Sequence, residues 1–294
     1  MKRALILAAS AMLTLPAQAI TVLTSIKPIQ LMVTELTEGV TTPEVLVQSN
    51  ASPHDYSLRP SDVKKVASAD LVIWYGHDLE PFLEKVVSNR SSTLTLSEIP
   101  NLALREFDSA HSHDHDGHDH GSHDPHFWLG IKPVKQVAQA VVNKLVEIDP
   151  ANAKTYSNNL VKFEEQLAAK DKEIEQQLAP VKNQGYFVFH DAYGYFEERY
   201  QLNNLGHFTV TPDRKPGAKT LIQIRKTLGS GNVACVFSEP QFTPAVVESV
   251  MRGSNVAKGE LDPLGSTIKV EPGSYFNLLG NMADSFEQCL AKQG

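Results

Sequence analysis

The residues Asn152–Ala179 read NAKTYSNNLVKFEEQLAAKDKEIEQQLA, a stretch without glycine or proline that ends before Pro180. Its apolar side chains recur at spacings of three, four and seven residues, as on one face of a helix. They are Tyr156, Leu160, Phe163, Leu167, Ile174 and Leu178. At 1.5 Å per residue this helix is roughly 40 Å long, longer than most crossover helices. We therefore expect a rigid linking helix over 151–180, laid across two domains.

Strand-like and helix-like patterns alternate on both sides of this stretch, which is typical of parallel sheets flanked by helices. Apolar or β-branched runs predict strands at Ile20–Ser25, Glu44–Gln48, Asp70–Tyr75, Phe127–Leu129, Tyr186–Phe189, Val233–Ser238 and Ile268–Val270. Ser61 is a candidate N-cap for an early helix. The predicted fold class is α/β, with an N-terminal lobe over 20–150 and a C-terminal lobe over 181–294. We expect each lobe to be a mostly parallel sheet flanked by helices.

The first residues have the pattern of a secretory signal peptide. Lys2 and Arg3 precede the apolar run Ala4–Leu15, and Ala17–Ala19 (AQA) forms a small-residue cleavage site. We expect a signal peptide over 1–19, cleavage after Ala19 and a periplasmic mature chain, with no cysteine there to carry a lipid. The full chain has a net charge of −7, and loss of the two early cations makes it more negative. This balance disfavours nucleic acid as a partner and favours cations.

Only two cysteines occur, Cys235 and Cys289. In an oxidising compartment an even pair favours a disulfide, although two buried thiols are the alternative. Such a bond would be worth about 4 kcal/mol in the chain-entropy model.

Seven of the chain's 11 histidines lie between Asp108 and Leu129 (DSAHSHDHDGHDHGSHDPHFWL). Six of them alternate with Asp, Ser and Gly in a loop over 108–125, namely His111, His113, His115, His118, His120 and His123. Imidazole is a common ligand of zinc, copper and nickel, so we interpret this segment as an auxiliary metal-binding loop. A loop without a fixed coordination geometry would discriminate poorly between these metals. A solvated spacer that happens to be rich in histidine is the alternative.

Three single histidines lie where predicted strands meet loops: His54, His126 and His190. A lone histidine at such a position is more often structural, but ligands of α/β folds collect at strand ends and between domains. Three such positions, divided between the two lobes, favour a shared metal site. His77 and His207 read as surface or structural residues, with a secondary metal contact as the alternative. Partners that orient the imidazoles are expected, but the sequence does not locate them.

Several motifs together resemble the cluster A-I metal receptors of ABC importers, over essentially the whole mature chain. They are Ala51–Asp62 (ASPHDYSLRPSD), Asp124–Leu129 (DPHFWL), Phe189–Phe196 (FHDAYGYF), Ser238–Phe242 (SEPQF) and Leu261–Gly265 (LDPLG). The acidic His-rich loop, and His rather than a carboxylate at position 190, are similar to the zinc receptors of this family. The resemblance implies two α/β lobes joined by one long helix.

The resemblance also implies which residues bind metal. By position, His54, His126 and His190 would hold Zn²⁺, and Asp262 matches a fourth, carboxylate ligand. Some zinc receptors instead use a Glu just before the first histidine together with water, but Pro53 stands there in this chain. The fourth ligand is therefore either Asp262 or water. Three imidazoles and one oxygen suit tetrahedral Zn²⁺.

The function implied is a periplasmic receptor that captures Zn²⁺ and delivers it to the inner-membrane ABC permease of a zinc importer. The expected protein is a monomer and not an enzyme, with periplasmic zinc chaperones as further candidate partners and no role for nucleic acid. One alternative is a manganese receptor or adhesin of the same fold, although manganese prefers oxygen ligands. A zinc-dependent hydrolase is another, but the chain has no H-E-x-x-H and no evident general base beside these histidines.

Overall fold

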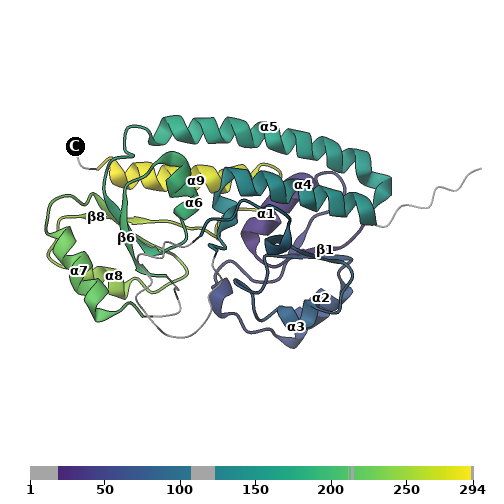
Figure 1. Ribbon diagram of the computed structural model, residues 1–294, viewed down its shortest axis with the longest axis horizontal. Coiled ribbons are helices and arrows are strands. Elements are labelled where there is room, and N and C mark those ends of the chain that lie inside the picture. Colours follow the sequence, from purple (N-terminus) through teal and green to yellow (C-terminus); the bar gives the residue numbers. More distant parts are fainter. Residues whose placement is uncertain (1–18, 107–122, 211, 213–214, 293–294) are drawn as a thin grey trace, which may run out of the picture.

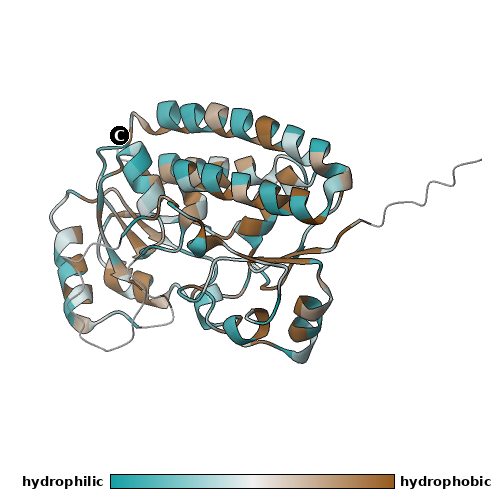
Figure 2. Ribbon diagram, turned by 45° about the vertical axis from the view of Figure 1, so that its right-hand side comes forward, coloured by the Kyte–Doolittle hydropathy of each residue, from teal (hydrophilic) through white to brown (hydrophobic). Residues whose placement is uncertain are grey.

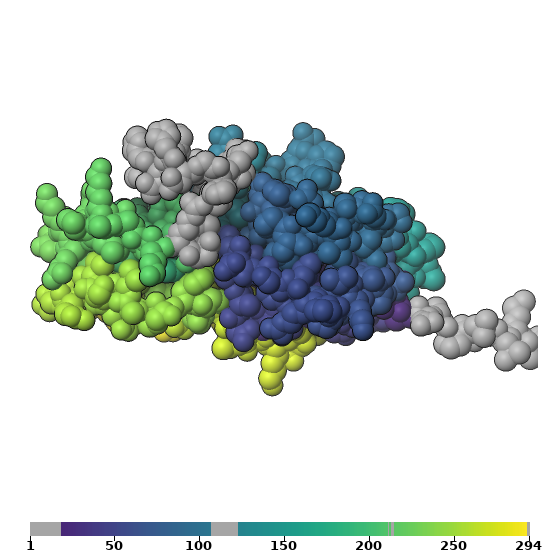
Figure 3. Space-filling view, turned by 90° about the horizontal axis from the view of Figure 1, so that it is seen from below, coloured from purple at the N-terminus to yellow at the C-terminus, as the bar shows by residue number. Residues whose placement is uncertain are grey.

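The computed structural model describes residues 19–106, 123–210, 212 and 215–292. Two four-stranded sheets form its frame, with the strand orders β2-β1-β3-β4 and β6-β5-β7-β8. All pairings within both sheets are parallel. The strands are β1 (Val22–Thr24), β2 (Glu44–Val45), β3 (Leu71–Trp74), β4 (Thr93–Thr95), β5 (Tyr186–His190), β6 (Asn204–Thr209), β7 (Cys235–Ser238) and β8 (Ala257–Glu260). The first sheet forms the N-terminal lobe and the second the C-terminal lobe, which lie side by side (Figures 1 and 3).

Helices cover both sheets, and the fold is the predicted α/β class. The helices are α1 (Lys27–Leu36), α2 (Pro60–Ser68), α3 (Glu84–Val87), α4 (Ile131–Ile148), α5 (Ala153–Leu178), α6 (Gly194–Tyr200), α7 (Ala218–Leu228), α8 (Ala245–Met251) and α9 (Ser274–Leu290). Single 3₁₀ turns occur at η1 (Pro53–Asp55), η2 (Leu96–Glu98), η4 (Phe127–Leu129) and η5 (Pro150–Asn152). The central strands β3 and β5 are buried along their whole length, as expected for parallel strands covered on both faces.

The long helix α5 runs along both lobes (Figure 1). The six apolar positions that predicted it are all buried, and they pack against α4, α1 and α9. Hydrophilic residues cover much of the rest of the helix (Figure 2). The sequence therefore predicted both this helix and its role as a connection between the lobes.

A second connection was not predicted. Helix α9 follows the C-terminal sheet but packs on α1 of the N-terminal lobe as well as on α5. At its first turn the Glu35 carboxylate accepts hydrogen bonds from the backbone N–H groups of Gly273 and Tyr275, at 2.8 and 3.2 Å. A carboxylate at a helix N-terminus is stabilised by the free N–H groups and the helix dipole. The C-terminal helix thus anchors the two lobes to one another.

Three local predictions were wrong. Phe127–Leu129 is the 3₁₀ turn η4 rather than a strand, although all three side chains are buried. Ile268–Val270 forms no strand. The edge strand of the C-terminal sheet is β8, which the sequence did not reveal because its residues AKGE are partly exposed and lack an apolar run. Helix α2 begins at Pro60 and not after Ser61, because the Asp62 carboxylate accepts the N–H of Arg59 at 2.8 Å. Short apolar runs fit either a strand or a buried turn, so packing decides between them.

Cys235 of β7 and Cys289 of α9 form the predicted disulfide. The signal-peptide prediction and five histidines of the auxiliary loop, His111, His113, His115, His118 and His120, lie outside the described residues. Within the described part of the chain, no helix is long and apolar enough to span a membrane.

Candidate metal centre

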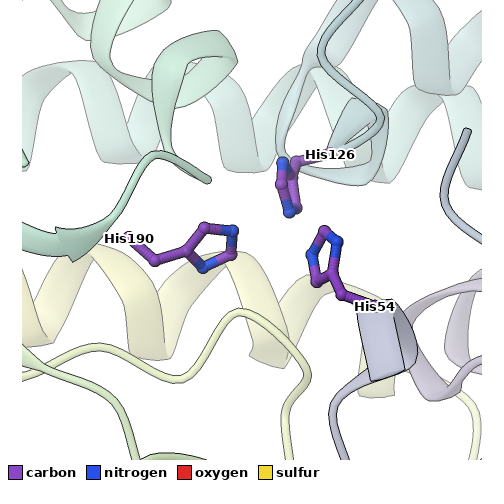
Figure 4. Close-up of side chains that lie close together, drawn as sticks. All are labelled: His54, His126 and His190. Atoms are coloured by element: carbon purple, nitrogen blue, oxygen red, sulfur yellow. The ribbon is translucent and has the colours of Figure 1, made fainter. Parts of the chain in front are cut away.

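The structure brings His54, His126 and His190 together at the boundary between the lobes (Figure 4). Their ligand nitrogens lie within 4.8 Å of one another, and in the described residues no other group of three or more His, Cys, Asp or Glu side chains does so. The ring centroids are 4.8 to 5.6 Å apart. This spacing allows one small cation to contact all three rings.

Each histidine is fixed by a different local structure. His54 lies in the turn η1, where Pro53 occupies the first position and the His54 N–H donates to Ser52 Oγ at 3.3 Å. His126 precedes η4, and His190 is the last residue of the buried strand β5. Carboxyl ends of parallel strands are where α/β folds place their ligands, so the position of His190 follows from the topology.

A buried carboxylate orients His126. Asp124 Oδ1 lies 2.7 Å from His126 Nδ1 and also accepts the His126 backbone N–H at 3.0 Å. Burial raises the pKa of Asp124 to about 6, against the lowering effects of the His126 N–H and of Arg105. Burial likewise lowers the pKa of His126 well below its usual value, so that ring is neutral at pH 7. A neutral ring that donates from Nδ1 directs the Nε2 lone pair at the site.

His190 has a similar partner. Its Nδ1 lies 3.3 Å from the carboxylate of Glu239, which is itself buried. Burial lowers the pKa of His190, but Glu239 and the nearby Asp191 and Asp124 outweigh that effect, so the pKa lies above its usual value. The Nε2 atom is buried without a hydrogen-bond partner among the described residues. A buried polar atom without a partner is costly, and a bound cation would satisfy this one.

The space between the rings suits an ion. The cavity there has a volume of ≈ 10 Å³ and is lined by Pro53, Trp128, Glu239, Phe242 and Pro263 as well as the three histidines. That is room for about one water-sized sphere. Three imidazoles within reach of one point are a donor set that suits Zn²⁺ better than Mn²⁺, which prefers oxygen.

A family model described as the periplasmic component A of a zinc-uptake complex, ZnuA, matches residues 22–289. This chain belongs to the ZnuA family. The high-affinity zinc uptake system protein ZnuA of Yersinia pestis is 44% identical over 288 residues, covering 92% of this chain and 91% of that one. ZnuA of Haemophilus ducreyi is 41% identical over 290 residues, covering 92% and 93%. Members of the ZnuA family are receptors for zinc uptake and not enzymes, as predicted.

Solved structures agree with this assignment. A crystal structure of ZnuA superposes with a TM-score of 0.79 at 25% identity, covering 93% of this chain and all of that one. A zinc-bound ZnuA deletion mutant gives 0.77 at 25% identity, covering 92% and 98%. The periplasmic zinc-binding protein TroA of Treponema pallidum gives 0.79 at 22% identity, covering 93% and 99%, and shares the fold. The ZnuA family and its two-lobed fold are therefore those predicted from the motifs.

The structure does not bring Asp262 into the histidine group. Its Oδ1 accepts hydrogen bonds from Gln241 Nε2 at 2.8 Å and from the Leu264 N–H at 3.2 Å. Its Oδ2 accepts the N–H and the hydroxyl of Ser266 at 2.5 and 2.6 Å. Asp262 therefore stabilises its own loop, a role that the motif LDPLG does not reveal.

Among the described residues, the other histidines, His77, His123 and His207, lie outside the group of three. His77 is exposed, and its Nδ1 lies 3.0 Å from Glu84 Oε2. His207 lies 3.7 Å from Asp191 Oδ2. His123 pairs with Glu106 in an antiparallel bridge, and the Asp124 N–H donates to the Arg105 carbonyl at 2.7 Å. These two contacts join the ends of the segment 107–122.

Sequence reasoning missed Asp124 and Glu239 as partners of the imidazoles. Asp124 had one available signal, because an Asp two residues before a histidine can accept from both its backbone and its ring. Glu239 had none, since it lies 49 residues from His190 and reaches it through the pairing of β5 with β7.

Proposed function

We propose that this chain is a periplasmic receptor that captures Zn²⁺ with His54, His126 and His190 and delivers it to an inner-membrane ABC permease. The observation that carries the proposal is the convergence of these three imidazoles, whose ligand nitrogens lie within 4.8 Å of one another around a cavity of ≈ 10 Å³. Membership of a family of periplasmic zinc-uptake components supports both the metal and the transport role.

Water is the fourth ligand that we infer. Both carboxylate oxygens of Asp262 already accept hydrogen bonds within their own loop. Pro53, at the position before His54, has no side-chain atom that could bind a metal. Zinc sites with three histidines commonly keep one position for water. Replacement of Asp262 by Ala should then lower zinc affinity less than about tenfold, whereas loss of a direct ligand costs more than the 10–100-fold typical of outer-shell partners.

We also propose how the chain reaches the periplasm and how zinc reaches the chain. Cleavage after Ala19 would release the mature chain into the periplasm, where it would act as a monomer and could receive zinc from periplasmic chaperones. The auxiliary loop histidines, His111 to His123, would collect zinc at weaker sites and raise its concentration near the receptor.

The test uses the purified mature chain and a competing chelator. We expect one tight zinc site per chain and a preference for Zn²⁺ over Mn²⁺ in a competitive titration. A tighter site for Mn²⁺ would instead support the manganese-receptor alternative. Zinc uptake by cells that lack their own receptor but keep the permease should return when this chain is supplied. Uptake that stays absent, although the exported chain binds zinc, would contradict the delivery role.

A further inference from the structure

The carboxylate that orients His126 lies beside an arginine, Arg105, which also contacts a second carboxylate. Arg105 Nη1 lies 3.4 Å from Asp124 Oδ2, and the same guanidinium donates from Nε to Glu198 Oε1 at 2.6 Å. Glu198 belongs to α6 of the C-terminal lobe, whereas Arg105 and Asp124 belong to the N-terminal lobe. A single guanidinium thus connects the partner of a candidate zinc ligand to the opposite lobe.

Tyr195 of α6 reinforces this connection. Its hydroxyl accepts the Arg105 backbone N–H at 2.9 Å and donates to the Asp124 carbonyl at 2.8 Å. The guanidinium also lies against the backbone of Gly194, where a Cβ atom would overlap it. Three residues of α6 therefore contact Arg105. Gly194 and Glu198 contact its guanidinium, and the Tyr195 hydroxyl contacts its backbone N–H.

Charge explains why Asp124 needs this arginine. The Asp124 side chain has no exposed surface, while Arg105 is 13% exposed. A buried carboxylate without a cation is strongly destabilised, and without Arg105 its side chain would turn towards water. That movement would remove the acceptor that holds His126 Nδ1. The imidazole would then be free to rotate or to change tautomer, and Nε2 would lose its fixed direction.

We propose that Arg105 is a positioning residue for zinc binding, which acts through Asp124 to fix the His126 imidazole and ties that ligand to α6 of the other lobe. This inference rests on the zinc-receptor function proposed above and names a residue that prepares its site. Because none of these contacts involves the metal, His126 is held in place before zinc arrives. Such preorganisation increases affinity by lowering the ordering cost of binding.

The experiment compares Arg105→Ala with wild type in the mature full chain, by zinc competition, by the zinc dissociation rate and by the absorption spectrum of bound Co²⁺. We expect about tenfold weaker zinc binding, within the range for outer-shell partners of metal ligands, and a Co²⁺ spectrum altered by the displaced imidazole. Arg199→Ala is the matched control, because Arg199 of α6 makes two ion pairs with α5, to Asp171 and Glu175.

A double-mutant cycle separates action through Asp124 from general destabilisation. In an Asp124→Asn background, Arg105→Ala should change zinc affinity less than about twofold, since the intermediary is already lost. An equal loss in both backgrounds, or the same loss in Arg199→Ala, would overturn the proposal. So would wild-type affinity and an unchanged Co²⁺ spectrum in Arg105→Ala.

Milder variants keep the test decisive if Arg105→Ala does not fold. Gly194→Ala should displace the guanidinium and reproduce the altered Co²⁺ spectrum, while Arg105→Lys should recover part of the affinity. Two folded variants with wild-type spectra and affinities would refute the role of Arg105. Failure of the receptor function is distinguishable, because wild type itself would then lack a tight zinc site.

Discussion

The indole Nε1–H of Trp128 donates a hydrogen bond to the carbonyl oxygen of Pro263, 2.9 Å away and 135 residues later in the chain. The contact joins the turn after His126 to the loop that contains Asp262. Trp128 and Pro263 both line the cavity between the three histidines. Tyr275 at the start of α9 adds a hydrogen bond to the Trp128 carbonyl at 2.6 Å. One wall of the site therefore consists of hydrogen bonds that cross the lobe boundary.

This relationship predicts that the lobes move little on zinc binding. Helices α5 and α9 both pack on elements of each lobe, so a wide hinge motion would break buried contacts. We expect the radius of gyration from small-angle scattering to change by less than about 1 Å between the metal-free and zinc-bound chain, as in preorganised complexes. A larger change would show that the lobes open. Trp128→Phe, which loses the indole donor and part of the buried ring, should enlarge the difference.

His190→Ala should lower zinc affinity by more than about 100-fold, beyond the usual effect of an outer-shell partner. The variant removes the buried Nε2 that lacks a partner among the described residues. Calorimetry with a competing chelator measures the loss. His77→Ala is the matched control, because the exposed His77 ring makes only a weak, solvent-exposed pair with Glu84. This variant should bind zinc as tightly as wild type. Equal affinities of the two variants would remove His190 from the site.

Replacement of residues 107–122 by a short glycine linker should leave the tight site intact. The ends of this segment are already joined, by the bridge between Glu106 and His123 and by the hydrogen bond from Asp124 to Arg105. Five of the six auxiliary histidines are lost in this variant. We expect fewer zinc ions per chain by elemental analysis but an unchanged affinity at the tightest site. Loss of tight binding would mean that the segment itself supplies a principal ligand.

The double substitution of Cys235 and Cys289 by Ala should lower stability without weakening the metal site. The disulfide closes a loop with a sequence separation of 54. Its loss should cost about 4 kcal/mol in the chain-entropy model, which corresponds to a melting temperature lower by about 10 °C for a chain of this size. Thermal unfolding without metal measures the effect. A variant that melts like the oxidised wild type would contradict it.

Glu80 should make stability depend on pH. Its side chain is fully buried and accepts the Tyr75 N–H at 2.8 Å. Burial raises the pKa of Glu80 from 4.5 to about 7, so between these values the folded chain holds a proton that the unfolded chain has lost. The stability supplied by this group is complete below pH 4.5 and is lost as the pH rises through about 7.

Glu80→Gln removes that titration while keeping the shape of the side chain. The stability of wild type relative to this variant should fall by about 3 kcal/mol between pH 4 and pH 8, at 1.36 kcal/mol per pKa unit. Chemical unfolding of the metal-free proteins at several pH values measures the difference. A difference independent of pH would show that Glu80 does not titrate in this range.

The sequence determined the elements whose signals are local and long. Six apolar residues in phase over 152–179 specify one amphipathic helix, and no other regular structure buries them on one face. Alternating strand and helix patterns likewise specify the α/β class, and the position of His190 at the end of β5 follows from it. The predicted positions of the three histidines at strand and loop boundaries were enough to select them as one candidate site, although His126 in fact precedes a 3₁₀ turn.

Only the tertiary structure decided what depends on contacts between distant residues. The run Phe127–Leu129 becomes a buried turn because it packs beneath α4 and α6. Both carboxylate oxygens of Asp262 accept hydrogen bonds from its own loop. Glu239 comes close to His190 only because β5 pairs with β7. Arg105 meets Glu198 across 93 positions. Residue types show that such groups can pair, but the packing of the lobes decides which partners come within hydrogen-bond distance.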